Sequence, residues 1–228
     1  MKITFLGHAG FLIDGSASVL IDPFLTNNPV AVQSEGDLKA DYVLVSHGHH
    51  DHMGDAVPIA KRCNSTAVGV AEIANYFSRH DANAHAMHIG GAHDFGPLKI
   101  KLTPAWHGSS LPRDDGTMEY LGTPCGFIVE MDGKTIYHAG DTGLFGDMRL
   151  IGKHSGIDLA LIPIGDNFTM GPEDALEAIK LIKPKRVVPM HYNTWPLIEQ
   201  DVEKFKQEVE TNTDTKVTIL KPGESAEV

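Results

Sequence analysis

The stretch VLVSHGHHDHMGD, residues 43–55, places four histidines and two aspartates directly behind a short apolar run. Residues 41–46, DYVLVS, predict a buried strand, after which the chain leaves the sheet edge in a loop. His47 and His49 stand two positions apart, so on extended backbone their side chains project to the same side. Two imidazoles that face one way can bind one metal ion. The cluster therefore predicts a metal site at the end of a strand.

The second half of the cluster offers ligands for another metal ion. Asp51 and His52 are adjacent, so at a turn they can present a carboxylate and an imidazole to a second site nearby. His50 is aimed away from the first pair and is expected to be a spacer. Residues 54–55, Gly-Asp, predict the start of a helix, which would bring a positive helix end close to the site.

Three further candidate ligands follow other predicted strands. His107 comes after PLKIKL, Asp141 comes after KTIY, and His191 follows VVPM. Glycines flank the turn that holds Asp141, so its backbone and carboxylate can approach other groups closely. A carboxylate has two oxygens and can bridge two metal ions, which in such pairs lie about 3.5–4 Å apart. The chain thus offers enough nitrogen and oxygen ligands for two metals.

Short strands dominate the remainder of the sequence, and helices are expected outside them. Asp132-Gly133, between two apolar strands, is a strong signal for a tight hairpin. No linker or low-complexity tract divides the chain. Two β-rich halves with helices outside predict one α/β domain over residues 1–228, a four-layer αββα sandwich. Helices are expected over residues 71–80, 171–184 and 198–210, and the closing strand over residues 216–223.

The charge balance restricts the partners of the chain. Its 19 Lys and Arg against 30 Asp and Glu give a formal net charge of -11. Nucleic acid is not expected as the main partner, because phosphate backbones favour clustered Lys and Arg. Cys63 and Cys125 are expected to be reduced thiols. The amino terminus lacks the pattern of a signal peptide, and no run approaches the roughly 18 apolar residues of a membrane span. The expected location is the cytoplasm.

Taken together, these motifs resemble the metallo-β-lactamase-fold hydrolases over almost the whole chain. GHAGFLI, SHGHHDHMGD, YHAGDTG, GDNFTMGPEDA and PMHYNTWPLIEQD are similar to the UlaG-like branch of metal-dependent hydrolases. That branch is related to the bacterial ascorbate-phosphate lactonases. The resemblance implies two sets of metal ligands joined by a bridging aspartate: His47, His49 and His107 in one set, Asp51, His52 and His191 in the other, and Asp141 between them.

A centre of this kind favours hydrolysis. Two divalent cations leave it positively charged even after Asp51, Asp141 and a bridging hydroxide are counted. The pKa of metal-bound water falls to about 7, so hydroxide is available at neutral pH, and Asp51 is expected to orient it as a catalytic residue. We expect cleavage of an ester, a lactone or a phosphodiester of a small anionic metabolite. Zinc and manganese are the first candidates, and iron, cobalt and nickel also suit such ligands.

Further residues are expected around the ligands. The resemblance places Asp22, in LIDP, behind them. His8, in the glycine-flanked GHAGF, is either a core histidine or a pocket residue. Asn193 is expected to rim the pocket, and Thr169 either helps to bind an anionic group or caps a helix. His138, inside a predicted strand, is expected in the core or behind the ligands. The remaining histidines carry no pattern and are expected to be structural or at the surface: His80, His85, His88, His93 and His154.

Other functions remain open at this point. A phosphodiesterase or nuclease would use the same centre, although the acidic balance argues against long RNA. Iron in one site would instead give a redox enzyme, and a metal-dependent regulator without enzymatic activity is the third alternative. Because relatives of this kind often assemble, a homo-oligomer is compatible with each of these functions.

Overall fold

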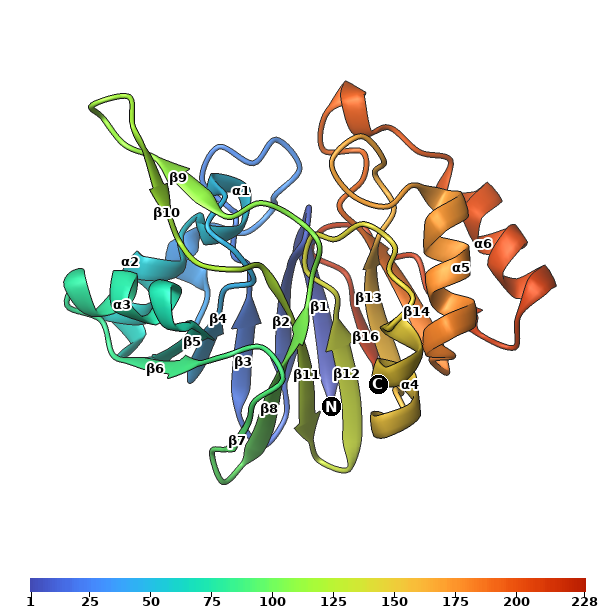
Figure 1. The fold of residues 1–228 in the computed structure, drawn as a ribbon, viewed down its shortest axis with the longest axis horizontal. Helices are drawn as coiled ribbons and strands as arrows, with labels where there is room; N and C mark the ends of the chain where they lie inside the picture. The colour runs from blue at the N-terminus through green and yellow to red at the C-terminus, as the bar shows by residue number, and fades with distance from the viewer.

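Two seven-stranded β-sheets form the middle of the molecule in a computed structural model of the chain (Figure 1). The structure describes residues 1–228 except for the side chains of residues 154 and 155, so the prediction for His154 lies outside the described part. The first sheet contains, in spatial order, β16 (Ser225–Glu227), β1 (Lys2–Gly7), β2 (Gly10–Asp14), β3 (Ser18–Ile21), β4 (Tyr42–Leu44), β5 (Thr66–Val70) and β6 (Ala84–Met87).

The second sheet repeats this arrangement. Each sheet has an antiparallel part followed by a parallel part, and the parallel part begins after β3 in the first sheet and after β12 in the second. The order of the second sheet is β15 (Lys216–Val217), β14 (Arg186–Met190), β13 (Leu159–Pro163), β12 (Lys134–His138), β11 (Cys125–Met131), β8 (Leu98–Pro104) and β7 (Ala92–Asp94).

The predicted hairpin at Asp132-Gly133 is confirmed. Met131 of β11 pairs with Lys134 of β12, so only two residues form the turn. Asp132 has a φ of 52° and Gly133 a φ of 71°. Two positive φ angles match the turn type that fits the right-handed twist of adjoining strands.

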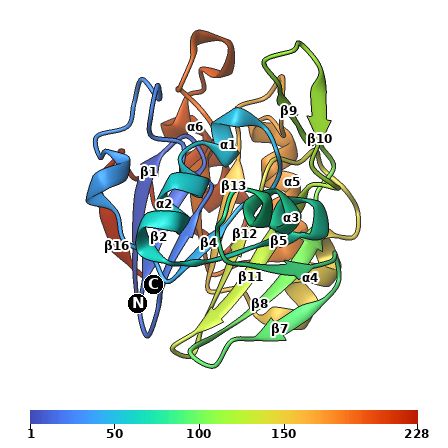
Figure 2. The ribbon, with the colours of Figure 1, turned by 90° about the vertical axis from the view of Figure 1, so that its left-hand side faces the viewer.

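Helices cover the outer face of each sheet. Figure 2 shows α2 (Ala56–Cys63) and α3 (Ala71–Arg79) in front of the first sheet. The second sheet is covered by α4 (Met148–Ser155), α5 (Pro172–Ile182) and α6 (Val202–Asn212) (Figure 1). The predicted four-layer αββα sandwich, in one domain, is therefore confirmed. Short helical turns are α1 (His50–Met53), η1 (Glu35–Asp37) and η2 (Pro196–Ile198).

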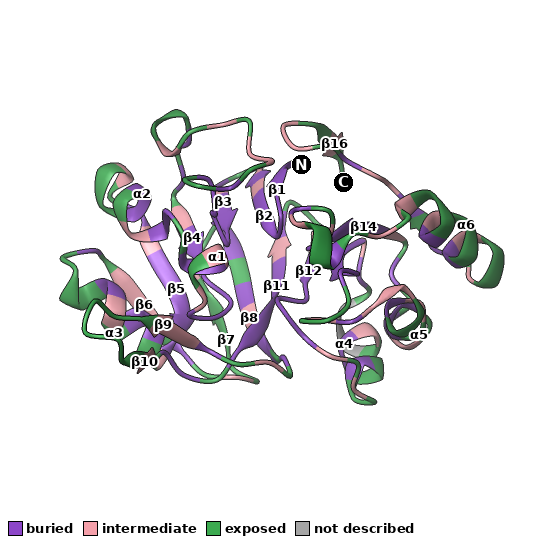
Figure 3. Cartoon of the chain, turned by 90° about the horizontal axis from the view of Figure 1, so that it is seen from above, coloured by how far each residue is buried: buried purple, intermediate pink, exposed green. Residues whose placement is uncertain are grey.

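The pattern of buried and exposed residues agrees with this layered arrangement. Figure 3 shows that the strands are mostly buried, whereas α3, α5 and α6 expose their outer sides. Residues such as Phe11 and Phe127 lie in one large core that includes both sheets, and Ile162 and Ile179 lie in a second core between the second sheet and its helices. Within the described residues, the structure contains no helix long and apolar enough to cross a membrane. Cys63 and Cys125 are free thiols.

Several short elements differ from the sequence-based expectation. Residues 216–223 do not close the chain as a strand, because only Lys216–Val217 pairs there and β16 at Ser225–Glu227 pairs with β1. A hairpin of β9 (Ser110–Pro112) and β10 (Met118–Tyr120) was not predicted, and it projects from the body of the molecule (Figure 1). The predicted helix start at Gly54-Asp55 is confirmed, because Asp55 is the N-cap of α2. The short helix α1, which starts at His50, was not predicted.

Candidate metal centre

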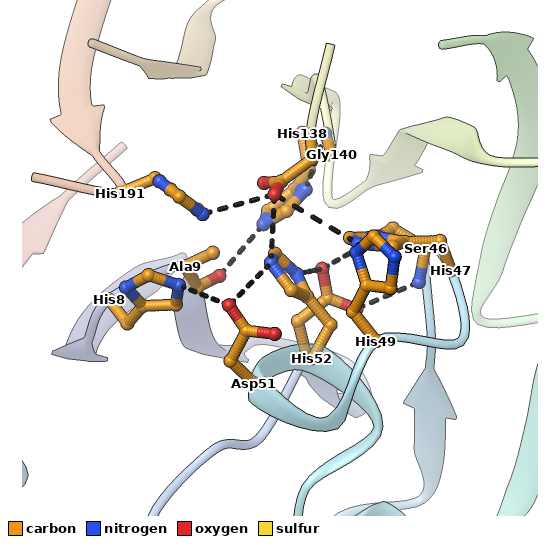
Figure 4. Close-up of polar contacts among 12 residues, drawn as sticks. His8, Ala9, Ser46, His47, His49, Asp51, His52, His138, Gly140 and His191 are labelled. Carbon is orange, nitrogen blue, oxygen red and sulfur yellow. Dashed lines mark hydrogen bonds and ion pairs between the residues drawn. The ribbon is translucent and has the colours of Figure 1, made fainter. Parts of the chain in front are cut away.

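The candidate ligands meet at one edge of the two sheets, where strands end. Asp22 follows β3, and the loop after β4 carries the cluster that begins at His47. Asp141 and His191 follow β12 and β14 of the other sheet. Carboxyl ends of parallel strands lie at the same edge, which is why residues so distant in sequence come together. Figure 4 shows the labelled histidines and Asp51 pointing toward one another.

One group consists of His47, His49 and His107. Nδ1 of His49 lies 3.0 Å from Nε2 of His47 and 3.2 Å from Nε2 of His107. Burial lowers the pKa of all three imidazoles, and the neutral form is the one that binds metals. Four nitrogens bound to one zinc at about 2.0–2.1 Å lie about 3.3 Å apart. The spacing of this group fits a single metal ion.

Asp141 connects this group to His52 and His191. Its Oδ2 lies 3.0 Å from Nε2 of His191 and 3.2 Å from Nε2 of His52. The same oxygen lies 3.5 Å from Nε2 of His107 and 3.9 Å from Nε2 of His47. Burial would raise the pKa of Asp141, but His191 and His52 outweigh burial and hold this pKa well below its ordinary value. Asp141 is thus a buried carboxylate that faces histidines of both groups.

Three buried atoms of the candidate ligands lack a hydrogen-bond partner among the described residues: Nε2 of His52, Nδ1 of His191 and Oδ1 of Asp141. A buried polar atom without a partner costs about 1–3 kcal/mol, and such atoms in a native protein call for an explanation such as an ion. Imidazole nitrogens and carboxylate oxygens are common ligands of a divalent cation, so the residues present fit a metal centre.

Asp22 determines which nitrogen two of the imidazoles present. Its carboxylate accepts hydrogen bonds from the backbone N–H of Ser46 at 2.8 Å, the Ser46 hydroxyl at 2.6 Å and Nδ1 of His52 at 2.8 Å. Because the Ser46 hydroxyl donates to Asp22, its oxygen accepts from Nδ1 of His47 at 2.9 Å. We assign the proton of both imidazoles to Nδ1 from this network, which leaves both Nε2 lone pairs for a metal.

His8 is a partner of Asp51, and the ligand pattern of the sequence did not include it. Its Nε2 lies 3.1 Å from Oδ2 of Asp51, and its Nδ1 lies 2.8 Å from the hydroxyl of Thr194. Burial, followed by the charge of His191, lowers the pKa of His8 to about 4. His8, Asp51, His52 and His191 also place one ligand atom each within 4.8 Å of one another. The only signal for this role in the sequence was the glycine-flanked turn.

His138 ties the Asp141 turn to the turn that carries His8. Its Nε2 donates to the carbonyl of Ala9 at 2.9 Å, and its Nδ1 accepts from the backbone N–H of Gly140 at 3.1 Å (Figure 4). Burial lowers the pKa of His138, in agreement with a neutral ring that donates at one nitrogen and accepts at the other. His138 therefore positions the backbone on both sides of the centre.

Unusual backbone conformations concentrate at the centre. His8, Asp22 and His191 have φ angles of 58°, 46° and 55°. A left-handed conformation costs a non-glycine residue roughly 1–2 kcal/mol, and such residues cluster at functional sites. Gly140 also has a positive φ, and a Cβ there would lie 2.6 Å from the carbonyl oxygen of Cys125. The glycine before Asp141 is therefore required, as the sequence had indicated.

The other predicted residues lie farther from the centre. The His50 side chain is 70% exposed and belongs to none of the candidate ligand groups found among the described residues. The side chain of Asn193 pairs with the backbone of Gln200, and the hydroxyl of Thr169 donates to the carbonyl of Met170. Neither residue lines the cavity described next, and the N-cap of α5 is Gly171 rather than Thr169.

A cavity of about 420 Å³ opens onto the candidate ligands. Its volume lies within the range of roughly 300–1,000 Å³ that is typical of small-molecule sites. Part of its wall consists of candidate ligands and His50, and the rest consists of apolar side chains from the loops after β13 and β14. The lining residues are His49, His50, Asp51, His107, Asp141, Phe168, His191, Trp195 and Leu197.

Comparison with known proteins agrees with this geometry. The family model described as a beta-lactamase superfamily domain matches residues 11–192. A UPF0173 metal-dependent hydrolase of Pelotomaculum thermopropionicum is 64% identical over the full length of both chains. Another, from Archaeoglobus fulgidus, is 50% identical over 100% of this chain and 99% of its own. The solved structure of Igni18, a metallo hydrolase from Ignicoccus hospitalis, is 39% identical with a TM-score of 0.90, covering 100% of this chain and 98% of that one. The chain therefore belongs to the β-lactamase superfamily and, within it, to the UPF0173 family of metal-dependent hydrolases.

Proposed function

We propose that this protein is a dinuclear metal-dependent hydrolase that cleaves an ester, a lactone or a phosphodiester of a small molecule. The observation that carries the proposal is the position of Asp141, whose Oδ2 lies within 3.9 Å of Nε2 atoms from four histidines. One carboxylate between two histidine groups is the arrangement that a pair of metal ions needs. Bound divalent cations, zinc or manganese first, would lower the pKa of water to about 7 and polarise the scissile group.

The residues of the chain supply the remaining requirements. His47, His49 and His107 would hold one metal, and Asp51, His52 and His191 the other, with Asp141 shared. Hydrogen bonds and charges from His8 and His52 outweigh the effect of burial and lower the pKa of Asp51, so its carboxylate is ionised at neutral pH. Held at Oδ2 by His8, Asp51 would orient the attacking water, which is the catalytic role we assign to it. Similarity of the motifs to the UlaG-like lactonases supports a lactone or ester as the first substrate to test.

A substrate panel with metal counting on the same sample tests the proposal. Metal-loaded protein should contain two ions per chain and hydrolyse at least one class among esters, lactones and phosphodiesters. His47→Ala and Asp141→Ala should lose hydrolysis and metal, whereas His88→Ala, at an exposed histidine, should change neither. Full activity in both site variants would contradict the proposal.

Two other outcomes would favour the alternative functions. One iron per chain with oxygen uptake would indicate a redox enzyme. Tight, salt-sensitive RNA binding would indicate a nuclease, because salt dependence reports contacts with phosphates.

A further inference from the structure

The outer wall of the cavity above the candidate ligands is apolar. Phe168, in the loop between β13 and α5, is 51% exposed, and Leu197, in η2, is 62% exposed. Trp195 stands between the cavity and the buried histidine network, with its ring 4.8 Å from that of His8. Large apolar side chains that converge on one cavity from two loops are typical of a site for an apolar group.

No lysine or arginine is among the described residues that line this cavity. Its polar lining consists of His50 and the candidate ligands His49, Asp51, His107, Asp141 and His191. Arg113, the arginine of the β9–β10 hairpin, is paired with Glu119, which also pairs with Arg79. A phosphate group outside the metal centre would therefore find no side-chain cation in the cavity, although anion recognition normally uses one.

We propose that the substrate is an ester or lactone without a phosphate group, carrying an apolar acyl or alkyl chain beside the scissile bond. This inference rests on the proposed function. The carbonyl would reach the centre at Asp141, and the apolar chain would lie against Phe168, Trp195 and Leu197. In the reaction, water adds to the carbonyl carbon, the acyl carbon–oxygen bond breaks, and a carboxylic acid and an alcohol form, joined in one product when the substrate is a lactone. This proposal replaces the expectation of a small anionic metabolite with that of an uncharged substrate.

A series of γ-lactones with lengthening alkyl chains, from butyrolactone to nonalactone, tests this inference with metal-loaded protein. A fully buried methylene contributes about 0.8 kcal/mol, so kcat/KM should rise roughly two- to fourfold per methylene. Phe168→Ala and Leu197→Ala should flatten this dependence, so that kcat/KM for nonalactone falls toward the value for butyrolactone. Met118→Ala, at a 57% exposed methionine of the β9–β10 hairpin, should keep the full dependence.

A second readout does not require catalysis. Trp106 and Trp195 are the two tryptophans of the chain, one next to His107 and the other in the cavity wall. Titration of metal-free protein with N-methyl alkanamides, from acetamide to octanamide, should change tryptophan fluorescence with a dissociation constant that falls as the chain lengthens. Phe168→Ala should weaken the binding of the long amides alone.

The outcomes separate the two proposals. Hydrolysis that does not depend on chain length, or that is faster for a phosphorylated lactone, overturns this inference and leaves the hydrolase proposal standing. Absence of any hydrolysis by protein with two metals overturns the hydrolase proposal, and the fluorescence series then still decides whether the cavity binds apolar chains. Equal affinities along the amide series would contradict such binding.

Discussion

Oδ2 of Asp22 lies 2.8 Å from Nδ1 of His52, and both side chains are fully buried. Burial alone would lower the pKa of His52, but Asp141 and Asp22 outweigh burial and raise this pKa well above its ordinary value. Asp22 holds the ring by Nδ1, so Nε2 points to Asp141, and a metal that binds there has to displace the Nε2 proton. Outer hydrogen bonds of this kind fix the tautomer and orientation of a metal-binding imidazole.

Replacing Asp22 with asparagine should weaken metal binding without removing a ligand. In Asp22→Asn only one of the two carboxylate positions remains an acceptor. Either Nδ1 of His52 or the backbone N–H of Ser46 then faces an NH2 group, so the network no longer holds the ring in place. We expect the affinity for metal to fall roughly 10–100-fold, measured by competition with a chromogenic chelator. Asp14→Asn, at a surface aspartate paired with Lys2, is the control and should bind metal as the wild type does. An unchanged affinity in Asp22→Asn would show that Asp22 does not orient the ligand.

The number of metal ions bound per chain should distinguish Asp141, which we propose to be shared by two metals, from ligands that bind one metal each. His107→Ala and His52→Ala each remove an imidazole from one side of Asp141, so each variant should retain one metal ion per chain after dialysis. Asp141→Asn should lower the affinity for both ions, because Oδ2 faces histidines of both groups. Metal analysis by mass spectrometry measures these ratios. Two tightly bound ions in Asp141→Asn would contradict the shared role.

The layers of the fold were predictable because apolar periodicity is a local property of the sequence. Strands such as β13 and β14 contain apolar runs, and these runs are buried in the structure. β16, with the sequence SAE, has no such pattern and is a strand only because it pairs with β1. Whether a short segment at a sheet edge becomes a strand depends on pairing with a strand that is distant in sequence. The residues of the segment itself do not specify that pairing.

The candidate centre was predictable to a similar extent. Polar residues that follow predicted strands were the candidate ligands. Their side chains face one another in the structure because these strand ends lie at the same edge of the two sheets. The contact between His8 and Thr194 joins residues 186 positions apart, and the contact between His138 and Ala9 joins residues 129 positions apart. Nothing in either local sequence specifies its partner, so only the folded chain reveals these contacts.

Metal-free protein should lose stability in acid partly through His8. The pKa of His8 falls from its ordinary value of 6.5 to about 4 in the folded state. The unfolded chain therefore takes up a proton first, and stability falls as the pH drops from 6.5 toward 4, by about 3 kcal/mol at most. His8→Gln removes this titration, so urea unfolding of metal-free protein should depend less on pH in the variant. Parallel pH profiles for both proteins would contradict this assignment.

The hydroxyl of Thr194 should stabilise the pair of His8 and Asp51. In Thr194→Val, Nδ1 of His8 remains buried without a partner, which costs about 1–3 kcal/mol. Thr194→Ser keeps the hydroxyl and should restore most of the stability. Urea unfolding of metal-loaded protein measures the difference, and hydrolysis by the valine variant should fall because Asp51 is less well oriented. Equal stability of the valine and serine variants would show that the hydroxyl of Thr194 does not stabilise the pair of His8 and Asp51.

Gly140 and Gly143 lie on either side of Asp141, and their substitution by alanine should have opposite outcomes. Gly140 has a φ of 63°, and an added Cβ would meet the carbonyl of Cys125 at 2.6 Å and Ser46 at 3.1 Å. Gly140→Ala should therefore destabilise the protein by more than about 1–2 kcal/mol and displace Asp141, with loss of bound metal. Gly143 has nothing within 4 Å of an added Cβ, so Gly143→Ala should keep both stability and metal content. Thermal unfolding and metal analysis of the two variants provide the comparison, and equal behaviour would show that the turn does not depend on a glycine at position 140.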